Sequence, residues 1–449
     1  MRTRNTATLL GAIAVAAAVT LTGCAPSAST GATSTDPVSQ ADIDKALDTE
    51  TTLTYWTWVD GIQESVDAFT EAHPKITVNV VNVGQSADSV AKVRAALQSG
   101  KGFPDVFQVG YDYIGSFRQT DSLLDLTPYG GAELADEFTE SAWNQVADDE
   151  GVWAIPQDSG PLGNLYREDI YAAAGLDAAP VTYADFAVAA ETIKSATGSY
   201  ITNMPGNDMP QWIGSLWQAG VKPFDYSGGD EVGIEVNSEG AKEVFGYWQD
   251  LIEKDLVSVD PDFTDEFYQG LSSGKYASWV VPAWGPQFLT GTVADTAGLW
   301  RAAEAPQWNE GESISGNWGG SSNAVTAKTE NPIAAYELAD FVNTDAESTL
   351  HLANDASLFP TTVGTLESAE FTDAESDFFG GQQVNKLYAE IATTVDPDFD
   401  FLPFTEYVNT SFNETVGTAI TDRGDIVGAL DDWQDKLVSY AKQQGFTVK

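Results

Sequence analysis

The chain has 449 residues, and its 43% hydrophobic and 11% aromatic content is enough to fill the cores of two lobes or domains. Acidic residues outnumber basic ones by 67 to 21, and the resulting net charge of −46 argues against nucleic acid and anionic lipid headgroups as partners. A single cysteine excludes any disulfide within the chain, so stability must come from buried apolar side chains.

The first 24 residues have the pattern of a secretion signal. Arg2 and Arg4 precede an apolar run from about Leu9 to Leu21, which is about half the length of a membrane-spanning helix. The run ends in Leu21-Thr22-Gly23-Cys24, which resembles the lipobox of bacterial lipoproteins. That resemblance implies removal of residues 1–23 and acylation of Cys24, on the extracellular face of the cell membrane. The alternative is an ordinary signal peptide with an unrelated thiol.

A flexible tether is expected over residues 24–49. Residues 25–48 contain mainly Ala, Ser, Thr, Gly, Pro and Asp, with almost no large apolar side chains. Such a segment has too little apolar surface to order itself. The lipid at Cys24 would then be the only attachment to the membrane.

From residue 52 onward, strand and helix patterns alternate. Strands are predicted at 52–58, 76–80 and 105–109, and helices follow the first two, with apolar residues at helical spacing over 62–69 and 90–97. This alternation favours a parallel sheet covered by helices. Further on, the spacing predicts a strand at 276–281, a helix begun by Asn331-Pro332 and a final amphipathic helix over 426–440.

Aromatic and polar side chains follow the first three predicted strands, at the sheet edge where open α/β sheets bind ligands. They are Trp56 and Trp58, then Gln85, then Tyr111 and Asp112. The C–H face of a sugar packs on aromatic rings, and its hydroxyls bond to carboxylates and amides, so this chemistry suits a carbohydrate. Alternation along the strand puts both tryptophans on one face, and we expect one face of the strand to lie in the core.

Several motifs, in this order and spacing, resemble one family. They are Phe69–Pro74, Gly100–Val106, Leu123–Thr127, Trp153–Asp158, Gly274–Ala277, Pro282–Trp284 and Gly319–Val325. The chain resembles the extracellular solute-binding proteins of ATP-binding-cassette importers, in the family that binds oligosaccharides such as maltodextrins. Arg167 departs from the pattern, because the family usually has Asn or Asp there. We expect Arg167 to form a local ion pair or to begin a helix.

The resemblance implies an α/β protein with the two-lobe, type II periplasmic-binding-protein-like fold. Each lobe would be a mostly parallel sheet flanked by helices, with the ligand cleft between the lobes. The implied first lobe comprises residues 50–157 and about 323–358. The implied second lobe comprises residues 158–322 and about 359–449.

The same resemblance implies a set of ligand-binding residues from both lobes and from the crossings between them. They are Trp56, Trp58, Gln85, Tyr111, Asp112, Asp158, Ser159, Asn203, Asp208, Trp284, Gly320 and Ser321, with Trp217, Trp318 and Phe359 as weaker candidates. Trp284 is the foremost candidate for stacking on a sugar ring, because two prolines flank it after a predicted strand. The implied ligand is an extracellular oligosaccharide, which a monomer delivers to the permease subunits of the importer.

Catalytic, cofactor and metal sites are not expected. The chain has two histidines far apart, no thiol in its predicted body, and neither a Gly-x-Ser-x-Gly motif nor a phosphate loop. A secreted glycosidase is the alternative class, since it needs only two carboxylates about 5–10 Å apart. A polyol, peptide or cation is the alternative ligand. The loops 260–262 and 396–400 have part of a calcium-loop spacing but lack its central glycine.

Overall fold

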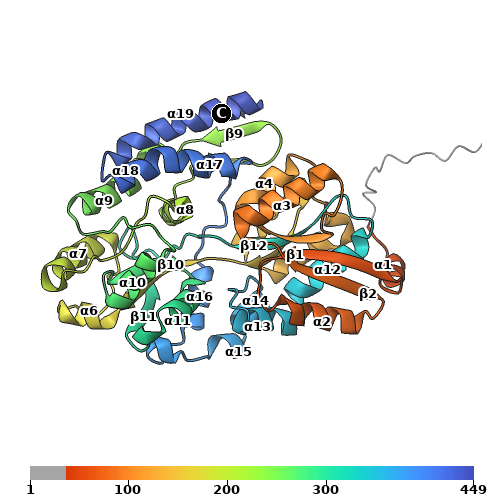
Figure 1. Cartoon of the computed structure of the whole chain (residues 1–449), viewed down its shortest axis with the longest axis horizontal. Coiled ribbons are helices and arrows are strands. Elements are labelled where there is room, and N and C mark those ends of the chain that lie inside the picture. The colour runs from red at the N-terminus through yellow and green to blue at the C-terminus, as the bar shows by residue number, and fades with distance from the viewer. Residues whose placement is uncertain (1–36) are drawn as a thin grey trace, which may run out of the picture. The chain divides into compact units, whose positions relative to one another are not determined.

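Two larger β-sheets, with two small ones of the orders β13-β9-β8 and β4-β5, organise residues 37–449, the part of the chain that the computed structural model describes (Figure 1). Cys24 and the predicted signal lie outside these residues. The first sheet has the strand order β2-β1-β3-β12-β6 and the second has the order β10-β7-β11. We call each sheet with its helices the first half and the second half. No helix within 37–449 has both the length and the apolar composition to cross a membrane.

The first sheet confirms the predicted strand and helix alternation. Its strands are β1 (Thr51–Thr57), β2 (Ile76–Asn82), β3 (Val106–Gly110), β6 (Ile155–Asp158) and β12 (Ser321–Val325). Its main helices are α2 (Ile62–Ala72), α3 (Ser86–Ser99), α4 (Tyr111–Arg118) and α12 (Pro332–Thr344). β1 pairs in parallel with β2 and β3, whereas β12 runs antiparallel to both β3 and β6. The sheet is therefore mixed, with two parallel and two antiparallel pairings, where a mostly parallel sheet was expected.

Burial explains why β1 forms at this place. Leu53, Tyr55 and Thr57 alternate on the buried face, as the period of a strand requires. The hydroxyl of Tyr55 donates a 2.8 Å hydrogen bond to Asn323 Oδ1 on β12, so the buried phenol is satisfied. Residues of β3 and β12 are buried throughout, because helices cover both faces of the sheet.

The second sheet corrects one part of the fold prediction. It consists of β7 (Leu162–Arg167), β10 (Ser278–Pro282) and β11 (Trp300–Glu304), and both pairings are antiparallel, where a mostly parallel sheet was expected. β7 begins at the crossing from the first half, whereas β10 and β11 run back toward it. Fully buried strands have the same apolar pattern in either direction, so the sequence carries no signal for this.

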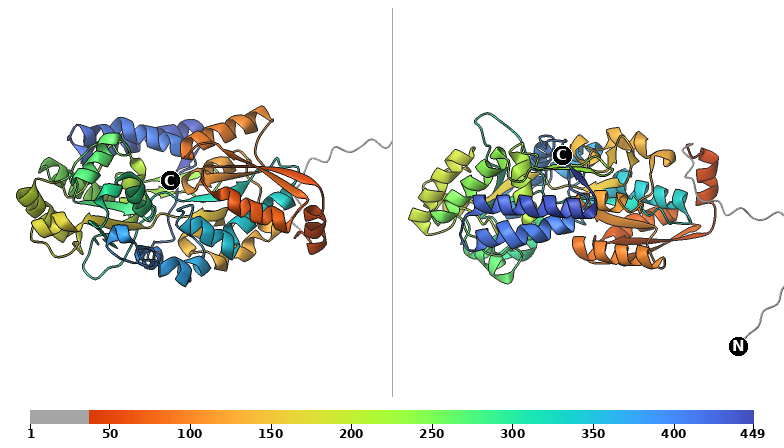
Figure 2. Two further views of the ribbon diagram at one scale, coloured as in Figure 1. Left: turned by 60° about the horizontal axis from the view of Figure 1, so that its bottom comes forward. Right: turned by 90° about the horizontal axis from the view of Figure 1, so that it is seen from above.

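Helices surround the second sheet and form the larger hydrophobic core (Figure 2). They are α6 (Glu168–Ala173), α7 (Tyr183–Thr197), α8 (Met209–Gln218), α9 (Glu239–Glu253), α10 (Asp265–Ser273), α11 (Gly285–Thr292), α16 (Val384–Ala392), α17 (Thr405–Phe412), α18 (Thr418–Thr421) and α19 (Ile426–Gln444). Apart from α1 and five short helical turns, the other elements are α5 (Glu140–Trp143), α13 (Ala346–Asn354), α14 (Val363–Glu367), α15 (Ala369–Thr372), β4 (Ala147–Asp148), β5 (Gly151–Val152), β8 (Phe224–Asp225), β9 (Glu231–Ile234) and β13 (Thr447–Val448).

The predicted tether is wrong over its last part, because α1 (Gln40–Leu47) is a helix. Ser39 caps it by accepting a hydrogen bond from the backbone N–H of Asp42, and such caps stabilise even short helices. The backbone N–H of Val38 also donates a 2.7 Å hydrogen bond to Pro128 O, which attaches this segment to the folded body. A tether can therefore extend only to about residue 36.

Three segments of the chain cross between the two halves. Residues 159–161 join β6 to β7, and residues 317–320 lead into β12. The third crossing passes Phe359, whose carbonyl accepts a 3.2 Å hydrogen bond from Ser159 N. Three adjacent crossings leave the two halves connected by a narrow strip of backbone.

Candidate binding site

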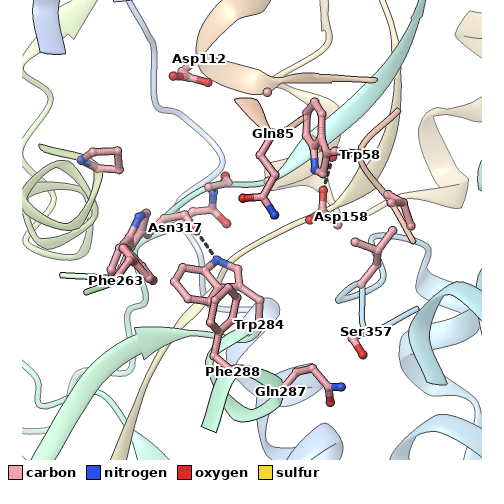
Figure 3. Close-up of a pocket in the computed structure, with 18 of the residues that line it drawn as sticks. Trp58, Gln85, Asp112, Asp158, Phe263, Trp284, Gln287, Phe288, Asn317 and Ser357 are labelled. Atoms are coloured by element: carbon pink, nitrogen blue, oxygen red, sulfur yellow. Dashed lines mark hydrogen bonds between the residues drawn. The ribbon is translucent and has the colours of Figure 1, made fainter. Parts of the chain in front are cut away.

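A cavity of about 740 Å³ lies between the two halves, beside the crossings. This is within the range of cavities that hold small-molecule ligands, which is roughly 300–1,000 Å³. Figure 3 shows Trp58 on one side of it and Trp284 on the other, with Gln85 and Asp158 between them. The first half contributes Trp58, Asp60, Gln85 and Asp112, and the second half contributes Asp208, Phe263, Tyr268, Trp284 and Phe288.

A hydrogen-bond network fixes the first wall of the cavity. The side chain of Gln108, fully buried on β3, accepts a 3.1 Å hydrogen bond from Trp58 N and donates a 2.9 Å bond to Ser321 Oγ. Ser321 Oγ in turn donates to Asp158 Oδ1. The ends of four strands are thus linked behind the cavity, which fixes the backbone beside the Trp58 ring.

Aromatic rings form the opposite wall. Trp284 follows β10, and its ring lies edge-on to Trp318 and Phe288, with centroids 5.1 and 5.2 Å away. Its indole Nε1 donates a 3.2 Å hydrogen bond to Trp318 O. Phe263, at 6.2 Å from Trp284, is 42% exposed and extends this wall. A half-buried tryptophan held by its neighbours and by its own N–H presents a rigid apolar face.

Two glycines shape the crossing that lines the cavity. Gly319 and Gly320 have φ of +85° and +96°, a backbone conformation that residues with a Cβ rarely adopt. A Cβ on Gly320 would lie 2.5 Å from the ring of Tyr111. The missing side chains therefore allow the chain to turn here, and both residues line the cavity.

The charge of the cavity lining is entirely negative. Its carboxylates are Asp60, Asp112, Asp158 and Asp208, and none of the described lining residues is Lys, Arg or His. Burial raises the pKa of Asp158, while the hydrogen bonds from Ser321 oppose the shift. Burial raises the pKa of Asp208 to about 7, against a bond from Gln211 N. Such a lining accepts hydrogen bonds and repels anions.

Asp112 gives the cavity a pH-dependent contribution to stability. Burial, helped by the charge of Glu406, which pairs with Arg94, raises its pKa from 3.8 to about 7. A pKa raised by folding means that the folded state holds the proton more tightly, so this contribution is lost as pH rises from about 4 through 7. We predict that Asp112→Asn reduces the fall in unfolding free energy between pH 4.5 and 8, measured by urea denaturation. An unchanged difference would contradict this.

Eight of the twelve predicted binding residues line the cavity: Trp58, Gln85, Asp112, Asp158, Asp208, Trp284, Gly320 and Ser321. The other four do not. Trp56 packs on the first-half core. Strand β1 ends at Thr57, and the ring of Trp58, just after the strand end, reaches the cavity. Tyr111 is buried under Gly320, Ser159 is joined by its backbone to Phe359, and the Asn203 amide bonds to Asp262.

The weaker candidates and the departing arginine also have clear positions. Trp318 lines the cavity. Trp217 and Phe359 are buried in the second core, where the indole of Trp217 stacks on Phe399 with centroids 4.1 Å apart. Arg167 confirms its prediction, because it forms two 2.8 Å hydrogen bonds to Asp169 and immediately precedes α6.

Several lining residues were not predicted: Phe263, Tyr268, Gln287, Phe288 and Asn317. Phe263 belongs to a loop that the sequence identifies through Asp-Pro, and its φ of +59° turns the chain there. Helical spacing shows that Phe288 follows Trp284 by one turn on α11, so the expected position of Trp284 was a usable signal for Phe288.

Together, the two halves, the crossings and the cavity define a two-lobe α/β binding protein. The chain belongs to the family of bacterial extracellular solute-binding proteins, which matches residues 55–348. Proteins of this family act outside the cell and bind solutes for importers, and they are not enzymes. The predicted family, fold class and general function are thereby confirmed.

Three similar proteins illustrate the family. The arabinooligosaccharide-binding protein of Halalkalibacterium halodurans is 24% identical over 375 residues, covering 81% of this chain and 82% of its own. A solved ABC-transporter-associated binding protein from B. animalis subsp. lactis Bl-04, in complex with β-1,6-galactobiose, is 28% identical and has a TM-score of 0.77 over 89% of this chain and 100% of its own. A galacto-N-biose-/lacto-N-biose I-binding protein of Bifidobacterium longum, in complex with lacto-N-biose, has a TM-score of 0.78 at 24% identity, covering 89% and 98%, which shows the fold.

Proposed function

We propose that this protein captures a neutral extracellular oligosaccharide and delivers it to the permease of an ABC importer. The observation that carries the proposal is the cavity, in which Trp58 and Trp284 lie on opposite sides with carboxylates and amides between them. Rings at both ends suit the apolar faces of sugar units, and the oxygen acceptors suit their hydroxyls. The similar proteins named above for arabinooligosaccharides, or solved with disaccharides, support this ligand class.

Capture would proceed by closure about the three crossings. We propose that the two halves are lobes, with residues 50–157 and about 323–358 in the first and residues 158–322 and about 359–449 in the second. Trp58 and Trp284 belong to different lobes, so one ligand that contacts both favours the closed form by its differential affinity. The closed form, acting as a monomer, would present one continuous surface to the permease subunits.

A glycosidase is the competing function, because four carboxylates line the cavity. We propose binding without catalysis: membership of the solute-binding family supports it, and the Asp158 carboxylate is already held by Ser321. Among residues 37–449, no three His, Cys, Asp or Glu side chains are grouped to hold a metal ion. We therefore assign no reaction to the cavity.

A melting-temperature panel tests the ligand class. We predict that a neutral oligosaccharide, such as an arabino- or galacto-oligosaccharide, stabilises the protein by about 2.7 kcal/mol at a concentration 100 times its Kd. Uronic-acid oligosaccharides of the same length should give no shift, because the described lining is negative and offers no cation. Polyols and peptides complete the panel. A shift with uronates or peptides and none with neutral sugars would contradict the proposal.

We propose that lipid on Cys24 holds the protein at the outer face of the cell membrane. A short tether would raise the effective concentration of the binding protein near its permease. Cys24→Ser is expected to move the protein from the membrane fraction to the medium and to abolish labelling by radioactive palmitate. Retention of the label in Cys24→Ser would contradict the assignment, and a Ser27→Ala variant serves as the matched control.

A further inference from the structure

A cluster of buried oxygen atoms adjoins the cavity at Asp208. We call its four residues, Asn203, Asp208, Gln211 and Asp262, the acceptor cluster. Asn203 Nδ2 donates a 2.6 Å hydrogen bond to Asp262 Oδ1. Gln211 Nε2 donates to Asn203 O, and Gln211 N donates to Asp208 Oδ1, both at 3.4 Å. The four residues therefore form one connected group, of which only Asp208 lines the cavity.

Three side-chain oxygens of the cluster have no hydrogen-bond donor. They are Asn203 Oδ1, Gln211 Oε1 and Asp262 Oδ2, on residues that are 2%, 3% and 4% exposed. The side-chain amides of Asn203 and Gln211 each donate an N–H inside the cluster, which fixes the orientation of both amides. The atoms of the cluster without a partner are therefore all oxygens that can only accept. A buried acceptor without a partner is costly, and three in one group indicate that a positive or donating species belongs there.

The cluster also carries two carboxylates without a counter-charge. Burial and the charge of Asp208 both raise the pKa of Asp262, to which Asp260 adds. Lys275 and the Tyr276 hydroxyl both bond Asp260 instead. Burial, and then the charge of Asp262, raises the pKa of Tyr268, so this phenol brings no counter-charge. Within residues 37–449, no Lys, Arg or His forms an ion pair with either cluster carboxylate. Ionising both buried carboxyls without a cation beside them would therefore be costly.

We propose that the acceptor cluster binds a hard cation, and that Ca²⁺ fits it best. Carboxylate and amide oxygens are the ligands that Ca²⁺ takes in proteins, and its double charge matches the two carboxylates. Because Asp208 faces the cavity, water there can supply the remaining ligands. The oxygen ligands come from separate segments at 203–211 and 262, so the site does not need the glycine of a continuous calcium loop.

The cation would act on sugar binding through Asp208. A bound Ca²⁺ favours the ionised form of this carboxylate, and an ionised carboxylate accepts stronger hydrogen bonds from hydroxyl groups. The cation site nevertheless does not depend on the ligand class proposed above, because the protein and water supply all of its oxygen ligands.

The test uses the full folded chain without any carbohydrate, dialysed against EDTA at pH 7.5. Calcium chloride is expected to raise the melting temperature by about 3 °C at roughly 100 times its Kd, whereas potassium chloride of equal ionic strength should not. Asp262→Asn should abolish the calcium response. Asp265→Asn, which removes an exposed acid three residues further on, should retain it.

Calorimetric titration of wild-type protein with Ca²⁺ keeps the test independent of how well Asp262→Asn folds, with one ion per chain expected. Absence of calcium binding to the wild type would overturn the proposal, as would an undiminished response in Asp262→Asn. A melting temperature that ignores calcium and falls as pH rises from 5 to 8 would show that a shared proton stabilises the cluster instead. Failure of the sugar proposal leaves all of these readouts unchanged.

Discussion

Replacing Trp284 with Ala is expected to weaken oligosaccharide binding about 100-fold, which corresponds to about 2.7 kcal/mol. The ring forms the centre of the aromatic wall, and Phe288 and Trp318 hold it edge-on. Truncation would remove the stacking face and leave water in its place. The measurement is the Kd by titration calorimetry, with the neutral oligosaccharide that gives the largest shift in melting temperature.

Fold and binding must be separated in that experiment. Trp284 is half-buried, so we expect its loss to cost only about 1–2 kcal/mol of stability. The Trp318 carbonyl that loses its partner can bond to water in the cavity. Trp284→Phe should recover most of the affinity, and Trp153→Ala, outside the cavity, should leave it unchanged. Unfolding of Trp284→Ala, or equal affinity for both Trp284 variants, would contradict the stacking role.

The second large effect is expected at Trp433, on the long C-terminal helix α19. Its side chain is fully buried, its ring lies 5.2 Å from Phe412, and its indole N–H lies 3.2 Å from Ser411 Oγ. Trp433→Ala should lower the unfolding free energy by about 3–5 kcal/mol, because it leaves a cavity and loses a hydrogen bond. Urea denaturation measures this directly.

The controls for Trp433 use the same helix. Trp433→Phe keeps most of the volume, so it should lose less than half as much stability. Gln443→Ala, on the exposed face, should change stability by no more than about 0.5 kcal/mol. Oligosaccharide affinity of the folded Trp433 variants should stay within about twofold of wild type. A loss below 1 kcal/mol in Trp433→Ala would show that α19 is not part of the second core.

The sequence predicted the fold where local patterns and burial agree. The alternation in β1 and the apolar stripe of α19 each have one buried face, and both elements lie where they were expected. Strand direction in the second sheet was not predictable, because buried strands carry no directional pattern. Helix α1 was missed, since its signal is the Ser39 cap and not apolar content.

The candidate site was predicted best where a side chain follows the end of a strand. Trp58, Gln85 and Asp112 all line the cavity for this reason. Trp56 does not, because it lies within β1, before the strand end, and packs on the first-half core. Phe263 and the acceptor cluster depend on loops that only the tertiary structure brings together, since Asp262 lies about fifty residues from Asp208 in the sequence.

Calorimetric titration with defined neutral oligosaccharides tests the central claim most directly, because it reports binding and turnover in one trace. We predict saturable heat with one site per chain, returning to baseline after every injection. No saturable heat with any neutral oligosaccharide would contradict the proposed function. A steady heat of hydrolysis after injection would contradict it equally, by showing a glycosidase in place of a binding protein.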